Sequence, residues 1–171
     1  RDQARAIRAK ALAQLDELLE RLADQVTARG GQVCWAEDGA AACRYIADLA
    51  RDRGVKLIVK SKSMASEEIH LNHALEQAGL EVVETDLGEY IIQLRKEPPS
   101  HIIAPAFHLN KEQVEETFRA AHTTLDPARS LSERQALVAE ARTMLRASFE
   151  AADAGITGAN FLAAEEGAAV I

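Results

Sequence analysis

The sequence predicts an α/β domain, a three-layer sandwich in which helices cover both faces of a mainly parallel sheet. Short apolar runs rich in β-branched residues alternate along the chain with helical patterns of about a dozen residues or more. Helices of that length are the usual right-handed connections between parallel strands. The chain has 171 residues, 47% of them hydrophobic and 27% charged, which is typical of one globular domain with a substantial core.

Helical periodicity and terminating glycines predict the first helices. Residues 3–28 place apolar side chains on one face, and Gly30 with Gly31 ends that pattern. Further helices are expected over Asp38–Arg53, from an N-cap at Ser66 through Ala78, and over residues 87–94 before a pair of prolines. Within the last of these segments, Tyr90–Leu94 is equally compatible with an extended strand.

Two capping-box patterns predict the helices of the second half. Asn110 with Gln113 indicates a helix over residues 111–122, and Ser132 with Gln135 indicates one that ends near Ala154. Each pair combines an N-cap side chain with a glutamine three residues later. Such a pair satisfies two backbone donors at the start of a helix.

Strands are expected where short apolar runs end at turn residues. The candidates are Gln32–Ala36, Val55–Lys60, Leu80–Glu84 and His101–Ala104. Residues 161–164 and 168–171 flank Glu165-Glu166-Gly167 and predict a hairpin. We expect residues 1–30 to form an amphipathic helix and residues 31–171 to form the α/β domain. Because the chain stops inside an apolar run, we expect this domain to be truncated at its C-terminal end.

Composition argues against several classes of function. A formal charge of -7 with 4% aromatic residues disfavours nucleic-acid binding, which uses positive charge and aromatic stacking. No apolar run approaches the roughly 20 residues that span a bilayer. The chain opens on Arg1 with an amphipathic pattern rather than a signal peptide, so we expect a cytoplasmic fragment. Cys34 and Cys43 show no metal-binding spacing and are interpreted as reduced structural thiols.

Candidate site residues follow the predicted strands, because parallel strands place their carboxyl ends at one edge of the sheet. The candidates are Lys60, Ser61, Lys62 and Ser63 after one strand, with Asp86 and Glu89 after the next. Lysines, hydroxyls and backbone N–H groups there would bind a small anion, and the two acids would pair with the lysines or exchange protons. The alternatives are solvated lysines, serines that satisfy a turn, and an Asp86 that initiates a turn.

Asn160 completes the candidate set, in the segment Gly155-Ile156-Thr157-Gly158-Ala159-Asn160. The glycines on both sides of Thr157 would let this backbone approach another strand or a ligand closely, although a purely structural turn is the alternative. The spacing does not match a dinucleotide-binding motif. His70 and His73 lack a third ligand, so no metal site is predicted. No nucleophile–base pair is evident, and catalytic residues are not assigned.

The same segments resemble the family of lactate-utilisation protein B. The resemblance covers most of residues 10–171 and is carried by residues 59–64, 67–69, 71–72, 82–94, 98–102, 104–106, 152–153, 155–161, 164–165 and 167. The first of these runs reads Val59-Lys60-Ser61-Lys62-Ser63-Met64. Glu166 departs from the pattern, since a small residue or threonine is expected there, which weakens any role for it.

The resemblance implies a fold like that of sugar-phosphate isomerases and CoA transferases. It also implies membership of a three-protein cytoplasmic system that oxidises L-lactate to pyruvate, with the other subunits as partners. In that family a ferredoxin-like region with 4Fe-4S clusters follows this domain. No cofactor is expected in the present fragment, because its two cysteines are too few for such a cluster.

Three functional hypotheses remain open at this stage. The first is a binding and assembly domain of a lactate-oxidising electron-transfer system. The second is an independent enzyme or binding protein for a small phosphorylated or carboxylated metabolite. The third is a structural scaffold.

Overall fold

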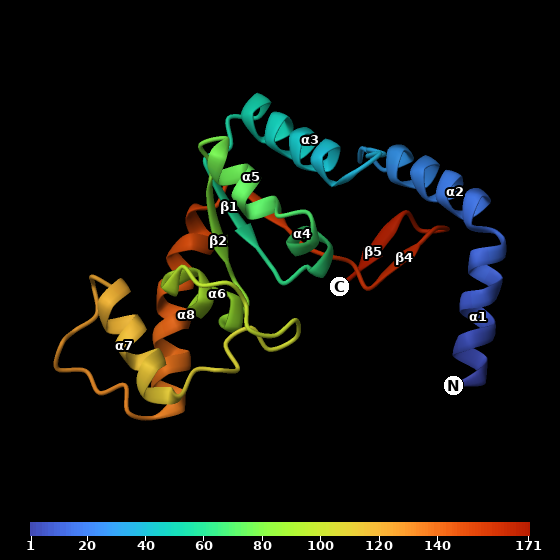
Figure 1. Ribbon diagram of the computed structural model, residues 1–171. Coiled ribbons are helices and arrows are strands. Elements are labelled where there is room, and N and C mark those ends of the chain that lie inside the picture. The colour runs from blue at the N-terminus through green and yellow to red at the C-terminus, as the bar shows by residue number, and fades with distance from the viewer. The chain divides into compact units, whose positions relative to one another are not determined.

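A computed structural model describes residues 1–171, which form two compact units (Figure 1). One unit contains residues 1–37 with 159–171, and the other contains residues 38–158. The helices are α1 (Asp2–Ala13), α2 (Leu15–Ala28), α3 (Gly39–Asp52), α4 (Met64–Glu68), α5 (Leu71–Gln77), α6 (Leu87–Arg95), α7 (Lys111–Ala121) and α8 (Arg134–Ala151). The strands are β1 (Leu57–Lys60), β2 (Glu81–Glu84), β3 (Ala154–Ile156), β4 (Phe161–Ala163) and β5 (Ala168–Val170).

A three-stranded parallel sheet organises the unit of residues 38–158. β1 lies in the middle and pairs in parallel with β2 on one side and with β3 on the other. The register places Lys60 opposite both Glu84 and Ile156. The Asp153 carboxylate ties the start of β1 to the segment before β3, because it accepts the backbone N–H groups of Lys56 and Leu57. The expected parallel sheet is confirmed.

Helices pack against both faces of this sheet. Ile58 of β1 and Val82 of β2 belong to a core cluster built with α3 and α5. Val83, the next residue of β2, packs instead against the cluster formed by α6, α7 and α8. Successive side chains of a strand point to opposite faces, so the two clusters lie on opposite sides of the sheet. Figure 1 shows α6, α7 and α8 gathered together. The predicted α/β class is therefore confirmed.

The other unit contains α1, α2 and the predicted hairpin. β4 and β5 pair antiparallel, with Phe161 opposite Val170 and Ala163 opposite Ala168, which confirms the hairpin. Its turn packs tightly against α2, since a Cβ at Gly167 would lie 2.6 Å from the carbonyl carbon of Gln25. Gly167 also has a φ of 58°, a conformation that favours glycine.

Two of the expected strands are wrong. His101–Ala104 forms an irregular bend, in which Nδ1 of His101 accepts the N–H groups of Ile103 and Ala104, each at 3.1 Å. Ile103 is 74% exposed, so the apolar run is not buried. Gln32–Ala36 also forms no strand. The third parallel strand is β3, which the sequence pattern did not reveal.

Helix boundaries differ from expectation in three places. The first helix is interrupted at Gln14, whose φ and ψ are -127° and 26°. The helix expected from Ser66 begins instead after Ser63, whose side chain caps α4, and the chain breaks again at His70 in a left-handed conformation. Glu133 rather than Ser132 precedes α8, because the Ser132 hydroxyl contacts Ser130 instead of capping the helix.

The Asn110–Gln113 capping box is confirmed in full. The Asn110 side chain accepts the N–H of Gln113, and the Gln113 side chain accepts the N–H of Asn110. The segment after β2 is helical, as α6, rather than extended. None of the helices combines the length and the apolar character that a membrane crossing requires.

Candidate functional site

The carboxyl ends of β1 and β2 bring together a buried ion pair. Nζ of Lys60 lies 2.8 Å from Oε1 of Glu84, and the two side chains are 1% and 6% exposed. The pairing follows from the sheet, because residues in register on neighbouring parallel strands point to the same face. A lysine is almost never fully buried without a partner. Glu84 is that partner, and it neutralises the Lys60 charge inside the protein.

Two further side chains complete this buried polar cluster. The Lys60 ammonium donates to Oγ of Ser66 at 3.2 Å, and Ser66 in turn donates to the carbonyl of Ser63. The Asn72 amide donates to Oε1 of Glu84 at 2.6 Å. The side-chain oxygen of Asn72 and the second carboxylate oxygen of Glu84, Oε2, are buried without a hydrogen-bond partner in the protein. A buried acceptor without a donor costs free energy, so this cluster is only partly satisfied by the protein itself.

The loop after β1 uses its serines for internal hydrogen bonds. Ser61 donates through its hydroxyl to Oγ1 of Thr157 at 2.8 Å, and its N–H donates to the carbonyl of Ile156. Ser63 caps α4 by accepting the N–H of Ser66. Gly158 lies so close that a Cβ there would be 3.2 Å from Cβ and Oγ of Ser63. The predicted close approach of the glycine-containing segment is thus made to this loop.

Lys62 is the partly exposed cation of the site. Its ammonium contacts the Glu89 carboxylate and lies 3.7 Å from Oε1 of Glu67. Burial by itself lowers the pKa of Lys62. The hydrogen bond and charge of Glu89, followed by the charges of Glu67 and Asp86, raise the pKa by more than burial lowers it. The pKa of Lys62 is therefore raised above the ordinary lysine value, and its side chain remains charged.

Glu67 is the acid of this group whose pKa is raised. Burial is the main cause, and the neighbouring Glu89 carboxylate adds to it, while Lys62 and Lys60 act in the opposite direction. Oε1 of Glu67 is buried and has no hydrogen-bond partner. A carboxyl that holds its proton to higher pH beside an ammonium group is suited to proton exchange at this edge of the sheet.

Asp86 has a structural task at the start of α6. Its side chain accepts the N–H groups of Gly88 and Glu89, which makes it the N-cap of the helix. This cap positions Glu89, which is 6% exposed, against Lys62. The capping agrees with the alternative interpretation of Asp86 as a turn residue, while its charge still acts on Lys62.

The structure brings six of the seven predicted site residues to one edge of the sheet. Lys60, Ser61, Lys62, Ser63, Asp86 and Glu89 share the unit of residues 38–158, whereas Asn160 belongs to the other unit. Its backbone N–H donates to Val170 in the hairpin. A role for Asn160 in this site remains a prediction.

The sequence pattern did not predict four further residues of the site, namely Glu84, Ser66, Asn72 and Glu67. Lys60 and Glu84 each end a buried strand, and a buried lysine requires an anionic neighbour. An alignment of the two predicted strands in parallel would therefore have identified Glu84 as the partner of Lys60. Glu67 and Asn72 carry no comparable signal in the sequence. They lie on α4 and α5, and where these helices begin could not be predicted accurately.

A second buried polar cluster lies among α6, α7 and α8. Nε2 of His122 lies 2.9 Å from the Tyr90 hydroxyl, and its Nδ1 lies 2.9 Å from Oε1 of Glu140. Arg129 donates to the other Glu140 oxygen at 2.7 Å. The Tyr90 pKa is raised, first by burial and then by the Glu140 charge. The His122 ring stacks on Phe118, with centroids 4.7 Å apart.

The remaining histidines and cysteines are dispersed. His73 contacts Gln77, and His108 lies 3.1 Å from Oε2 of Glu97. Cys34 is exposed, whereas Cys43 is buried and donates its thiol to the carbonyl of Ile69. No group of three or more His, Cys, Asp or Glu side chains is arranged to hold a metal ion.

Comparison with protein families assigns the chain. The profile of the LUD domain matches residues 19–171, which is most of the sequence. The chain belongs to the LUD domain family. The candidate site at the carboxyl ends of β1 and β2 lies within the matched LUD residues.

Curated relatives of this LUD domain carry a common name. The chain is 48% identical over 168 residues to Lactate utilization protein B of Bacillus velezensis, a match that covers 98% of the chain and 34% of the relative. It is 49% identical over 162 residues to Lactate utilization protein B of Bacillus subtilis, covering 94% of the chain and 33% of the relative. The chain thus spans about a third of the length of the curated relatives it matches. No solved structure matches it.

Proposed function

We propose that this LUD domain is the N-terminal domain of the iron–sulfur subunit of a cytoplasmic system that oxidises L-lactate to pyruvate. It serves binding and assembly with the other subunits of that system. The observation that supports the proposal best is the 48% identity over 98% of the chain to a protein named Lactate utilization protein B. The α/β layering is compatible with the isomerase and CoA-transferase type of fold, which we also propose.

The residues of this chain do not fit an iron–sulfur cluster. Such a cluster takes about four thiolates, and the chain has two cysteines. Cys43 is buried and engaged with Ile69, while Cys34 is exposed in the other unit. We therefore assign the 4Fe-4S clusters that the family resemblance implies to residues other than 1–171.

A chimera tests the lactate-utilisation role. In Bacillus subtilis, the matched third of its Lactate utilization protein B is replaced by this chain, in a strain that lacks the native copy. We expect growth on L-lactate as sole carbon source to be restored. A strain with the native gene is the positive control for growth, and the strain that lacks it is the negative control. A chimera that accumulates to the native level yet does not support growth would contradict the proposal.

For the site itself we propose binding of a small carboxylate or phosphate, with Lys62 as the principal cation. Lys60 is buried against Glu84 and its charge is already neutralised, whereas the Lys62 side chain is 25% exposed. An anion at Lys62 competes with Glu89 and Glu67 for the ammonium. Because the Glu67 pKa is raised, acid neutralises this competitor at a higher pH than for an ordinary glutamate. Affinity is therefore expected to rise as the pH falls.

Calorimetric titration with lactate, pyruvate and phosphate tests this binding. We expect a dissociation constant of about 1 mM or lower, roughly 4 kcal/mol, and a loss of about tenfold, roughly 1.4 kcal/mol, in Lys62→Ala. Lys10→Ala, at an exposed position in α1, is the matched control and should bind as the wild type does. Changing Lys60 as well is avoided, because that side chain is buried and its loss would affect folding. Equal affinity in Lys62→Ala and the wild type would remove Lys62 from the site.

A second candidate function is an enzyme acting on a small phosphorylated or carboxylated metabolite. Glu67 favours it, because a carboxyl with a raised pKa beside the Lys62 ammonium is a suitable proton donor. Incubation of the purified chain with a panel of sugar phosphates and hydroxy acids, followed by NMR, tests for turnover. The enzyme hypothesis expects turnover that Glu67→Gln abolishes while the fold is retained. Turnover that Glu67→Gln leaves unchanged would exclude Glu67 as the donor.

A further inference from the structure

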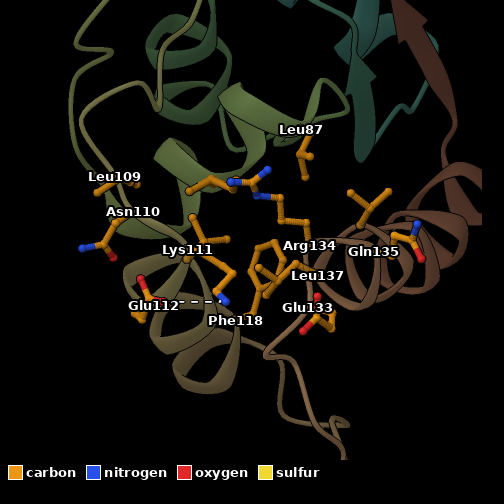
Figure 2. Close-up of a pocket in the computed structure, with 13 residues that line it drawn as sticks. Leu87, Leu109, Asn110, Lys111, Glu112, Phe118, Glu133, Arg134, Gln135 and Leu137 are labelled. Atoms are coloured by element: carbon orange, nitrogen blue, oxygen red, sulfur yellow. Dashed lines mark ion pairs between the residues drawn. The ribbon is translucent and has the colours of Figure 1, made fainter.

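A pocket of about 1120 Å³ lies where α6, α7 and α8 meet (Figure 2). Its floor is apolar and includes Phe118 and Leu137, both buried. Figure 2 shows Lys111 and Glu112 on one side of Phe118 and Gln135 on the other, with Leu87 above them. The candidate site residues 60–63 do not line it.

A second pocket of about 710 Å³ continues the first along α8. The two pockets share Leu87 and Val138, and the second extends to Phe149 near the end of the helix. We call the two together the α8 groove. From Arg134 to Phe149 the helix rises about 22 Å. An elongated depression of this length suits a polypeptide segment better than a compact metabolite.

Exposed apolar side chains line the α8 groove. Leu87, Val138 and Phe149 are 38%, 45% and 55% exposed, respectively. Val138 and Phe149 lie on the same stripe of α8 as Leu145, which lines the second pocket and is buried. Neighbouring large apolar side chains at a surface are characteristic of sites that bury them against another molecule.

The charges of the α8 groove are mainly positive. Arg142 and Arg146 line the second pocket, and no carboxylate does. Arg134 lines the first pocket, where Glu112 and Glu133 are also present and Glu112 lies 3.7 Å from Lys111. Arg134 and Arg142 make no ion pair, and Arg146 lies 3.9 Å from Glu150. On a chain with a formal charge of -7, this positive stripe selects an acidic occupant.

We propose that the α8 groove docks an acidic amphipathic helix of a partner protein. Apolar residues on one face of that helix contact Val138, Phe149 and Leu87, and flanking carboxylates pair with Arg142 and Arg146. About four helical turns match the length of the groove. Peptide binding to the α8 groove is measured with the purified chain alone. Its outcome therefore does not depend on whether the domain has the proposed role in lactate utilisation.

Fluorescence anisotropy with a labelled peptide tests the docking. The probe is a helix-stabilised peptide of about 18 residues with leucines at positions i, i+3, i+4 and i+7 and glutamates elsewhere. A peptide with lysines in place of the glutamates controls for charge. We expect saturable binding of the acidic peptide to the full chain, weakened about tenfold in Arg142→Glu with Arg146→Glu and weakened by added salt.

The matched control is Arg5→Glu with Arg8→Glu, which makes the same change in net charge on exposed positions of α1. This variant should bind the acidic peptide within about twofold of the wild type. Circular dichroism confirms that both double variants fold. Val138→Asn removes the apolar contact without changing the charge of the groove, and it should also weaken binding.

Two results would overturn the proposal. The first is equal loss of binding in the α1 control and the α8 variant, which would indicate a nonspecific charge effect. The second is a self-associated wild type in sedimentation analysis that the α8 variant converts to monomer, since the groove would then be occupied by a second copy of the chain.

Discussion

The Lys60 ammonium lies 2.8 Å from the Glu84 carboxylate at the adjacent ends of two parallel strands, and both side chains are almost completely buried. Removing one partner from such a pair leaves an uncompensated charge in the core, whereas removing both does not. This difference gives a test of whether the pair stabilises the sheet edge that carries the candidate site.

Lys60→Met should destabilise the chain by about 3 to 5 kcal/mol in urea unfolding. Adding Glu84→Leu should recover much of that loss, because no buried charge then remains. Arg51→Ala breaks the exposed pair with Asp48 and should cost less than about 1 kcal/mol. Strict additivity of the Lys60 and Glu84 changes would show that the two groups are not coupled.

We expect His122 to stabilise the packing of α6, α7 and α8, because it joins Tyr90 to Glu140. His122→Phe keeps an aromatic ring next to Phe118 but leaves the Tyr90 hydroxyl and one Glu140 oxygen without their partner. We expect a loss of about 2 to 4 kcal/mol in the free energy of unfolding. His108→Phe, at a ring that is 39% exposed and contacts only the partly exposed Glu97, is the control and should cost less than about 1 kcal/mol. A similarly small change in the free energy of unfolding in both variants would show that the hydrogen bonds of His122 to Tyr90 and Glu140 do not stabilise the fold.

The contact of Gly158 with Ser63 is expected to be sensitive to a single methyl group. Gly158→Ala places a Cβ 3.2 Å from Ser63 and should destabilise by about 1 to 2 kcal/mol. Gly155→Ala is matched to it, since a Cβ there would meet Val59 only at 3.9 Å. Its effect should be close to neutral, because alanine also reduces the entropy of the unfolded chain. The order of the two melting temperatures provides the measurement.

Glu67 should make the stability of the chain depend on pH. Its pKa is raised in the folded state, so the folded chain holds the proton more tightly than the unfolded chain. The contribution to stability is complete below the unfolded-state pKa and is lost as the pH rises through the raised folded-state pKa. Glu67→Gln imitates the protonated form and should therefore be more stable than the wild type at neutral pH.

Urea titrations from acid to neutral pH measure this effect. The advantage of Glu67→Gln should shrink as the pH falls, because the wild-type carboxyl becomes protonated. Glu68→Gln changes an exposed neighbour in the same helix and provides the control. A constant difference between Glu67→Gln and the wild type at all pH values would contradict the raised pKa of Glu67.

The local chemistry of the chain was sufficient to predict several elements. The Asn110–Gln113 capping box, the strands that end at Lys60 and Glu84, and the hairpin around Gly167 are confirmed with small shifts of boundary. Each depends on interactions between residues close in sequence or on a short apolar run between turn residues. The alternation of these strands with helices was enough to predict a parallel sheet.

Long-range packing decided the rest. β3 contains Ala154 and Gly155, which carry almost no strand signal, and it exists because its backbone pairs with β1. The apolar run at Ile102 and Ile103 has no partner, and local hydrogen bonds to His101 replace a ladder there.

The site shows the same division between sequence and tertiary structure. The order of residues was enough to predict that lysines, serines and acids of the two loops would be neighbours, because the carboxyl ends of parallel strands lie at one edge of the sheet. The pairing of Lys60 with Glu84 and the partly exposed position of Lys62 between Glu67 and Glu89 could not be predicted in this way and are seen only in the folded chain. The physical reason is that burial and ion pairing depend on the side chains that surround a group, and these come from segments distant in the sequence.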